Sequence, residues 1–373
     1  MDAQPGPLEY GMPLNLMTPL LLSIVGAASA APVSFSSPGD PVSVSFAFFG
    51  CNRVEKDEVE AGKVTNPSTA NRPELLANFR DIASVTPRPA FTVAGGDIVM
   101  NYVDDQGQAL RRQLDAWSKV VGKPKPSVIA VAGNHELNRK VDKLKLGNPP
   151  TDPIWSQWVK RNGLVPVSNG PNPKLDKWDN LIDDQRSLSF SFNKNGVHFV
   201  LLNTDTRVSR VDPATGQPFI GWIPLAWVSN DIRRAQADPG VKTIIVMGHR
   251  NLIDPAQVKG DAPIAKPAAD ALVSVFASAP KVKLYVCAHV HAYDVRKIEG
   301  TSAVQLVCGN GGSKLEKDWS PDGGPFFGFS IVNVYRSGRV GWQSYQRPVP
   351  EKEDVNGRTP AAVAVPQPWR FGE

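Results

Sequence analysis

From Pro41 onward, short apolar runs alternate with amphipathic stretches along the chain. The runs are rich in β-branched and aromatic residues, which favour strands. We therefore predict strands at residues 42–50, 90–96, 127–133, 187–193, 196–203, 242–248, 281–287, 302–308, 328–335 and 338–345. Apolar residues at helical spacing predict helices near residues 73–85, 105–121, 223–237 and 266–278. This alternation is typical of a layered α/β domain.

The N-terminal segment has a different pattern. The run PLNLMTPLLLSIVGAASAAP has an apolar middle and ends in small residues, including the triplet Ala28-Ser29-Ala30 that suits signal peptidase. Residues 1–31 therefore resemble a signal peptide and predict an exported protein, either periplasmic or secreted. No Lys or Arg precedes the run, so an N-terminal segment that stays uncleaved as an anchor is the alternative. We expect no other membrane partner.

The composition indicates a globular protein and a small anionic ligand. With 373 residues, 41% of them hydrophobic, the chain is long enough to bury a sizeable core. The net charge of +5 is spread along the chain, which favours a small anionic ligand over a stable nucleic-acid partner. Cys287 and Cys308 end two apolar runs, where they are either buried small residues or a disulfide. The oligomeric state does not follow from the sequence.

Polar clusters directly follow five of the apolar runs. They contain Cys51 and Arg53, Asp97, Asn134 and His135, His249 and Arg250, and His289 and His291. Because the carboxyl ends of strands in an open α/β sheet line one crevice, we expect these clusters to converge. Imidazole nitrogens and hard oxygens held on strand ends are suitable metal ligands. The fifth histidine, His198, lies inside an apolar run and is predicted to belong to the core.

In chain order the clusters read GCNR, GDIVM, GNHE, VMGH and AHVHAYD. This set resembles the calcineurin-like metallophosphoesterases, and most closely their purple acid phosphatase branch, whose pattern is GDxG, GDxxY, GNHD or GNHE, VxxH and GHxH. The resemblance covers roughly residues 42–346 and implies an α/β fold, a single-domain sandwich of two β-sheets flanked by helices (αββα). It implies a catalytic domain at residues 32–350, with an insertion or lid at 137–186 and a C-terminal tail at 351–373.

The resemblance also implies a centre of two divalent or trivalent metal ions, which would be iron, zinc or manganese. Asp97 would bridge the two ions. Asn134, His249 and His289 would complete one metal site, and His291 would belong to the other. His135 would contact the substrate phosphate and protonate the leaving oxygen after a metal-bound hydroxide attacks.

The chain departs from the family pattern at two positions. Cys51 stands where the family has Asp, and Met100 stands where the purple enzymes have an iron-binding Tyr. A thiolate is a competent ligand for iron or zinc, so Cys51 is predicted to bind the metal of His291, with simple packing as the alternative. Arg53 and Arg250 are predicted to bind phosphate oxygens, and an ordinary surface role is the alternative for each.

The sequence thus favours a metal-dependent phosphatase or phosphoesterase that acts on a small phosphorylated substrate. A degenerate, non-catalytic member that binds metal or phosphate is the alternative, but a scaffold has no need of the predicted proton donor His135. Trp155, Trp158 and Trp178 lie in the predicted insertion, where they either recognise a base or pack the insertion onto the domain.

Overall fold

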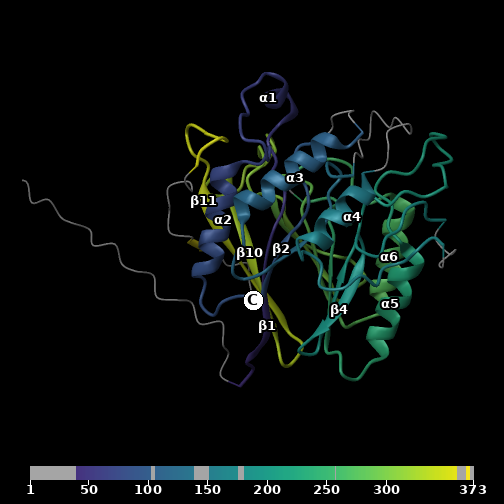
Figure 1. Cartoon of the computed structure of the whole chain (residues 1–373). Coiled ribbons are helices and arrows are strands. Elements are labelled where there is room, and N and C mark those ends of the chain that lie inside the picture. Colours follow the sequence, from purple (N-terminus) through teal and green to yellow (C-terminus); the bar gives the residue numbers. More distant parts are fainter. Residues whose placement is uncertain are drawn as a thin grey trace, which may run out of the picture. The chain divides into compact units, whose positions relative to one another are not determined.

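The computed structural model describes residues 39–101, 106–137, 151–174, 180–256, 258–358 and 367–369. These residues belong to one compact unit, Phe35–Glu373. Within them the strands form two six-stranded sheets, and helices pack on both sheets (Figure 1). None of the helices in these ranges is long and apolar enough to cross a membrane.

The first sheet combines a parallel half with an antiparallel half. Its strand order is β12 (Gln367–Trp369), β11 (Val340–Pro348), β10 (Phe326–Tyr335), β1 (Val42–Phe49), β2 (Phe91–Ala94) and β3 (Val128–Ala130). Strands β1, β2 and β3 run parallel, and β10 pairs antiparallel with β1. The parallel half therefore sends the residues after β1, β2 and β3 to the same edge of the sheet.

The second sheet has a parallel centre and antiparallel edges. Its strand order is β4 (Phe190–Lys194), β5 (Val197–Leu201), β6 (Thr243–Met247), β7 (Val282–Cys287), β9 (Val304–Cys308) and β8 (Tyr293–Lys297). The four central strands are parallel, while β4 and β8 pair antiparallel with their neighbours. The residues after β6 and β7 therefore also leave at one edge.

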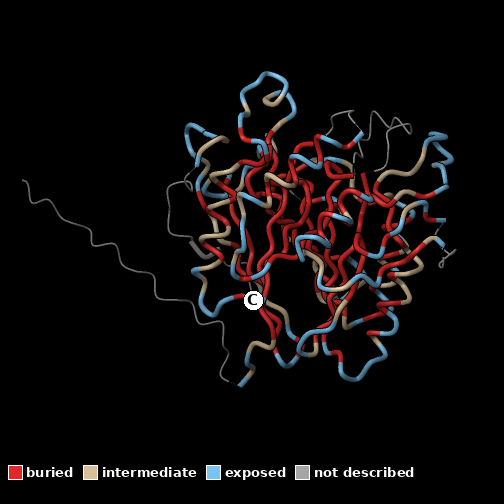
Figure 2. Tube along the Cα trace, viewed as in Figure 1, coloured by how far each residue is buried: buried red, intermediate tan, exposed pale blue. Residues whose placement is uncertain are grey.

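Alternate side chains of β1 show how the layers pack. Phe46 and Phe48 belong to a core cluster shared with the second sheet, and the Phe46 ring meets Phe199 of β5 edge-on with centroids 5.6 Å apart. Ala47 and Phe49 point the other way, into a second cluster with the helices. Both faces of the strand are therefore buried, as Figure 2 shows for the sheet interiors.

Two groups of helices cover the sandwich. Residues of α2 (Arg72–Ser84), α3 (Gln108–Val121) and α4 (Asp152–Arg161) pack on the first sheet, and α1 (Lys56–Glu60) is a short surface helix. Residues of α5 (Leu225–Ala237) and α6 (Lys266–Ala277) pack with the second sheet, and the two helices lie side by side (Figure 1). This confirms the predicted αββα fold class.

Each predicted strand and helix has a counterpart in the structure, and four elements were not predicted: α1, α4, β8 and β12. Strand β8 escapes the apolar pattern because it is an edge strand whose last residues, Arg296 and Lys297, are polar. In α4, Trp155 and Trp158 are buried, and the Trp158 ring lies 5.7 Å from that of Trp117 on α3. These two tryptophans pack the segment onto the domain. Trp178 lies outside the described residues.

Candidate metal centre

The predicted site residues follow β1, β2 and β3 of the first sheet and β6 and β7 of the second. Three of them have left-handed backbone, with φ of 56° at Cys51, 53° at Asp97 and 63° at His289. Residues other than glycine rarely adopt this conformation, and such strained positions concentrate at functional sites. Sharp turns thus follow β1 and β2 of the first sheet and β7 of the second, and each carries a predicted site residue.

The structure brings five of these side chains together. One ligand atom each from Cys51, Asp97 and His249 lies within 4.8 Å of the other two, and all three residues are buried. The Oδ1 atom of Asn134 is 3.1 Å from Nε2 of His249. On the other side, Nδ1 of His289 is 3.2 Å from the same Nε2. The sequence prediction that the strand ends converge is therefore confirmed for these residues.

His249 is oriented for metal binding. Its Nδ1 donates a hydrogen bond of 2.8 Å to the carbonyl oxygen of Gly95, so Nε2 faces inward. Oδ1 of Asp97 lies 3.3 Å from that nitrogen. Burial lowers the pKa of His249, but the Asp97 carboxylate outweighs it, so the net shift is upward. The position thus attracts one positive charge, either a proton or a metal ion that displaces it.

His289 completes this donor set. Its Nε2 lies 3.1 Å from the carbonyl oxygen of Ala262 and 2.9 Å from Nη1 of Arg250. With the Nε2 proton donated to Ala262, Nδ1 presents its lone pair to the side facing His249. Burial and the Arg250 charge lower the pKa of His289 well below its usual value, which keeps the imidazole neutral as a metal ligand must be. Two imidazole nitrogens, a carboxylate and an amide oxygen therefore fit a metal ion.

Cys51 contributes the sulfur of the cluster. Its Sγ accepts a hydrogen bond of 3.1 Å from the backbone N–H of His289. Burial, followed by the charge of Asp97, raises the pKa of the thiol well above its usual value. A coordinating metal ion deprotonates a thiol outright, so this shift is compatible with ligation. The predicted ligand role of Cys51 stays a prediction.

Sequence reasoning assigned no role to Glu136, which organises the centre. Its carboxylate accepts hydrogen bonds from the backbone N–H groups of Asp97, Ile98, Val99 and Gly133, at 2.7–3.1 Å. Burial and the nearby Asp97 carboxylate raise its pKa to about 7, while the N–H donors act against that shift. Glu136 joins the turn after β2 to the turn after β3. Its place as the acidic residue that ends the GNHE motif was the feature of the sequence that could have indicated this role.

His135 is held by hydrogen bonds around its ring and backbone. Its Nδ1 donates to the carbonyl oxygen of Met100 at 2.7 Å, and its Nε2 lies 3.8 Å from Oδ2 of Asp97. Its own carbonyl oxygen accepts a hydrogen bond of 2.8 Å from Nδ2 of Asn101. Burial and the charge of Arg53 lower the pKa of His135 well below its usual value. The ring is thus fixed with Nε2 beside the cluster.

His291 lies outside the group formed by Cys51, Asp97 and His249. Its Nδ1 donates a hydrogen bond of 2.7 Å to the carbonyl oxygen of Lys314. Burial, followed by the charge of Arg53, lowers its pKa to about 4. The predicted role of His291 at the other metal stays a prediction.

The two predicted phosphate-binding arginines lie in different surroundings. The side chain of Arg53 is 10% exposed, with Nε 3.6 Å from Oδ2 of Asp97, and Arg53 also lines a cavity of about 250 Å³. Arg250 is buried, and its guanidinium forms an ion pair of 2.8 Å with Asp205, a residue for which the sequence predicted no role. Arg250 also donates to the carbonyl oxygen of Ala262 at 2.5 Å. Substrate binding by either arginine stays a prediction.

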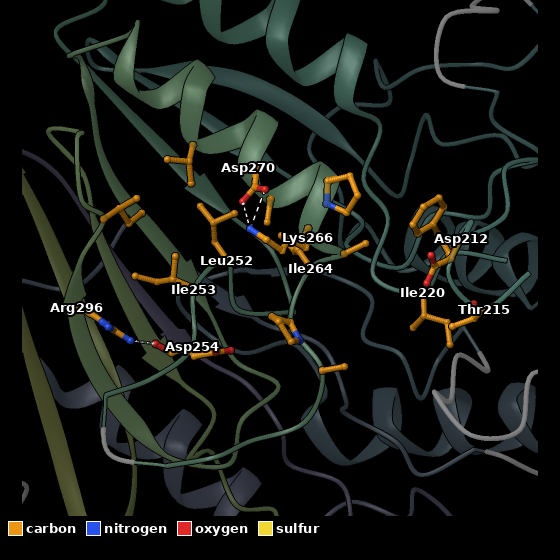
Figure 3. A pocket seen from close by; sticks show the side chains of 18 of the residues that line it. Asp212, Thr215, Ile220, Leu252, Ile253, Asp254, Ile264, Lys266, Asp270 and Arg296 are labelled. Atoms are coloured by element: carbon orange, nitrogen blue, oxygen red, sulfur yellow. Dashed lines mark hydrogen bonds and ion pairs between the residues drawn. The ribbon is translucent and has the colours of Figure 1, made fainter. Parts of the chain in front are cut away.

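A larger cavity of about 1110 Å³ lies beside α6 (Figure 3). Its wall includes apolar side chains such as Leu252, Ile253 and Ile264, while Lys266 and Asp270 form an ion pair at its edge. Ala262, whose carbonyl oxygen lies 3.1 Å from Nε2 of His289, is one of its lining residues, and none of the predicted site residues lines it.

Comparison with known proteins identifies the family. Residues 68–293, more than half of the chain, match the family model of calcineurin-like phosphoesterases, and the chain belongs to this family. Asp97, Asn134, His135, His249, His289 and His291 all lie within the matched residues. Cys51 and Arg53 precede them. No curated protein matches the sequence.

Several solved structures are similar in fold at low sequence identity. A dimetal phosphatase from Danio rerio is 14% identical with a TM-score of 0.49, and the alignment covers 81% of this chain and 99% of that one. A structure of PhoD is 13% identical with a TM-score of 0.49, with coverage of 84% and 70%. A putative 5'-nucleotidase from Staphylococcus aureus is 12% identical with a TM-score of 0.43, with coverage of 80% and 52%.

Proposed function

We propose that this protein is a metal-dependent phosphoesterase of the acid phosphatase type that hydrolyses a small phosphorylated substrate, most simply a phosphate monoester. Family membership supports metal-dependent hydrolysis of phosphate esters in general. The observation that carries the proposal is the convergence of Asp97, Asn134 and His289 on Nε2 of His249. This donor set lies at the ends of strands from both sheets, where α/β proteins bind ligands.

The residues that would hold metal are Asp97, Asn134, His249 and His289, with Cys51 as a further donor. When bound, metal ions in such a centre polarise the phosphoryl oxygens and lower the pKa of a coordinated water toward ~7. The chain's own contribution is to hold these donors in position. Glu136 does so through the backbone of Asp97.

The residue proposed to move a proton is His135. Its Nδ1–H is committed to the carbonyl oxygen of Met100, so Nε2 is the atom that can face a leaving oxygen. Protonation of Nε2 gives the imidazolium, which the negative charge of a bound phosphate would favour against the effects of burial and Arg53, and this proton would pass to that oxygen as its bond to phosphorus breaks. General acid catalysis of this kind typically contributes about 10²–10⁴-fold. Asn101 would position the residue through its backbone carbonyl.

The proposal is tested by assaying aryl phosphate hydrolysis after chelation and after reconstitution with iron, zinc or manganese. We expect activity to vanish on chelation and to return with metal. Asp97→Asn should lose both bound metal, measured by elemental analysis, and hydrolysis. Asp270→Asn, which removes an exposed carboxylate paired with Lys266, is the matched control and should keep both. Hydrolysis by a metal-free protein would contradict the proposal. Metal binding without hydrolysis of any phosphate ester would favour the non-catalytic alternative.

A further inference from the structure

We infer that the guanidinium of Arg53 serves as the second cation of this centre, so that the chain binds one metal ion and Arg53 binds the substrate phosphate beside it. This inference rests on the proposed phosphoesterase function. It differs from the two-metal centre that the family resemblance implies.

Arg53 is anchored on both its backbone and its side chain. Its N–H donates to the carbonyl oxygen of Asp97 at 3.0 Å, and its own carbonyl oxygen accepts a bond of 2.8 Å from Oγ of Ser313. Its Nη1 donates to Oε1 of Glu55 at 2.8 Å and to the carbonyl oxygen of Val54 at 3.2 Å. The guanidinium is thus a fixed charge and not a mobile surface group.

The carboxylate of Asp97 divides its two oxygens between different partners. Oδ1 lies 3.3 Å from Nε2 of His249 and accepts the backbone N–H of His135 at 3.1 Å. Oδ2 lies 3.6 Å from Nε of Arg53. One oxygen therefore faces the metal donors, while the other faces a permanent cation.

The donors for a second metal ion are also depleted. Of the donors predicted for that ion, Cys51 replaces the family's Asp and groups with Asp97 and His249, while His291 lies outside this group and its Nδ1 donates to the carbonyl oxygen of Lys314. Met100 replaces the Tyr of the purple enzymes. Across the described ranges, Cys51, Asp97 and His249 form the one group of three or more His, Cys, Asp or Glu side chains close enough to share an ion. A metal ion on Oδ2 would also face the Arg53 cation in a site with little water to screen the repulsion.

The position of Arg53 suits a substrate contact. The cavity of about 250 Å³ beside Arg53 is lined by Lys314 but also by the carboxylates of Glu58, Glu351 and Glu353, so it does not favour an anion. The guanidinium meets the metal centre through Nε, 3.6 Å from Oδ2 of Asp97, and a substrate phosphate bound to the metal would meet it there. Guanidinium groups bind phosphate oxygens through two parallel N–H donors, which gives both orientation and charge compensation.

The first measurement counts metal ions in the full-length protein. Protein loaded separately with excess zinc, manganese or iron and then freed of unbound metal should contain one ion per chain by elemental analysis. Two ions per chain with any of these metals would overturn the inference and leave the proposed function intact. Absence of both bound metal and hydrolysis would instead remove the proposed function on which the inference rests.

The second measurement follows binding of inorganic phosphate to the metal-loaded protein by calorimetry. Arg53→Ala should weaken phosphate binding by about 10–100-fold without lowering the metal content. Arg53→Lys should show a smaller loss, because lysine keeps the charge but lacks the planar pair of donors. Arg296→Ala removes an arginine from β8 and is the control, with an affinity within about twofold of the wild type. An Arg53→Ala protein with unchanged phosphate affinity would overturn the inference, and Arg53→Lys provides the same test if the alanine variant does not fold.

Discussion

Asp97 is the residue on which the chemistry of the centre depends most. Burial raises its pKa, but the charges of His249, His135 and Arg53 outweigh burial and hold the pKa well below its usual value. The carboxylate is therefore ionised across the working range of a hydrolase. Its backbone N–H is bonded to Glu136, so a buried acid determines where this charge lies. Glu136 thus holds the metal donor Asp97 in position without being a predicted ligand itself.

At the same scale, we expect His135→Ala to separate chemistry from metal binding. The variant should keep its metal, while kcat should fall by about 10²–10⁴-fold on alkyl phosphates, whose leaving groups need a proton. The loss should be smaller on nitrophenyl phosphate, whose leaving group departs without one. Steady-state kinetics with both substrates, together with elemental analysis, measure this. An equal loss on both substrates would exclude proton donation, and loss of metal would make His135 a ligand.

Cys51 offers a spectroscopic prediction. If the thiolate binds the metal, the iron-loaded protein should absorb in the visible through a thiolate band, and no phenolate band is expected because Met100 stands at the tyrosine position. Cys51→Ser should abolish the band and lower metal occupancy, whereas Cys51→Asp should retain metal and activity. Cys308→Ser is the control, because the Cys308 thiol donates a hydrogen bond to Ser330 and does not belong to the metal-donor group. A Cys51→Ala protein with full metal content and unchanged turnover would show that the cysteine only packs.

At the scale of single elements, a polar pair joins β5 to α5 on the second sheet. Nε2 of His198 lies 2.8 Å from Oδ2 of Asp231, and its Nδ1 lies 2.5 Å from Oδ1 of Asn193. His198 is buried, as its apolar surroundings in the sequence predicted, and neither Asp231 nor Asn193 belongs to a strand-end cluster. The pair therefore contributes to the fold and not to the chemistry.

We expect Asp231→Asn to lower the free energy of unfolding at pH 7 by about 1–3 kcal/mol, because it weakens a buried hydrogen bond. Burial raises the pKa of Asp231, but the hydrogen bond and charge of His198 outweigh it and lower the pKa below its usual value. A carboxylate with a lowered folded-state pKa stabilises the protein above the unfolded-state value. The difference from the wild type should thus shrink as the pH falls through the folded-state pKa.

Urea unfolding of both proteins from pH 7 down to pH 3 measures this dependence. Asp270→Asn is the control, since its exposed pair with Lys266 contributes only about 0–1 kcal/mol. A difference between Asp231→Asn and the wild type that stays constant over the whole range would contradict the assigned cause. Bound metal and hydrolysis should be unchanged in either variant.

At the scale of the whole molecule, the centre exists only because two sheets meet. Asp97 and Asn134 follow strands of the first sheet, whereas His249 and His289 follow strands of the second. The Phe46–Phe199 contact is one of the inter-sheet contacts in the core beneath. Any change that shifts the two sheets against each other should therefore separate the metal donors.

We propose that the protein is exported, on the basis of the apolar N-terminal segment that ends in Ala28-Ser29-Ala30. Expression of the full chain in a bacterium should give activity outside the cytoplasm, and N-terminal sequencing of the mature protein should begin near Pro32. Fractionation with a cytoplasmic marker enzyme is the control. Full-length protein in the membrane fraction would support the anchor instead, and full-length protein in the cytoplasm would contradict export.

The sequence alone determined the positions of ten of the twelve described strands and the type of chemistry. Both are local properties, because β-rich runs and the polar residues that end them are neighbours in the chain. The GNHE and AHVHAYD motifs are sufficiently specific that the family followed from them, and the family model confirmed it. The packing of Trp155 and Trp158, in contrast, was an open choice, since a buried and a ligand-stacking tryptophan have the same sequence pattern until their neighbours are known.

Only the tertiary structure decided how distant residues share the site. It placed Arg53 against Oδ2 of Asp97, Arg250 against Asp205, and Glu136 under the turns after two strands. These partners are separated by tens of residues and are joined by the pairing of neighbouring strands within each sheet, which no local pattern encodes. The sequence therefore determined which side chains can bind metal and phosphate, whereas the fold decided which of them meet, because distances between strand ends depend on the whole sandwich.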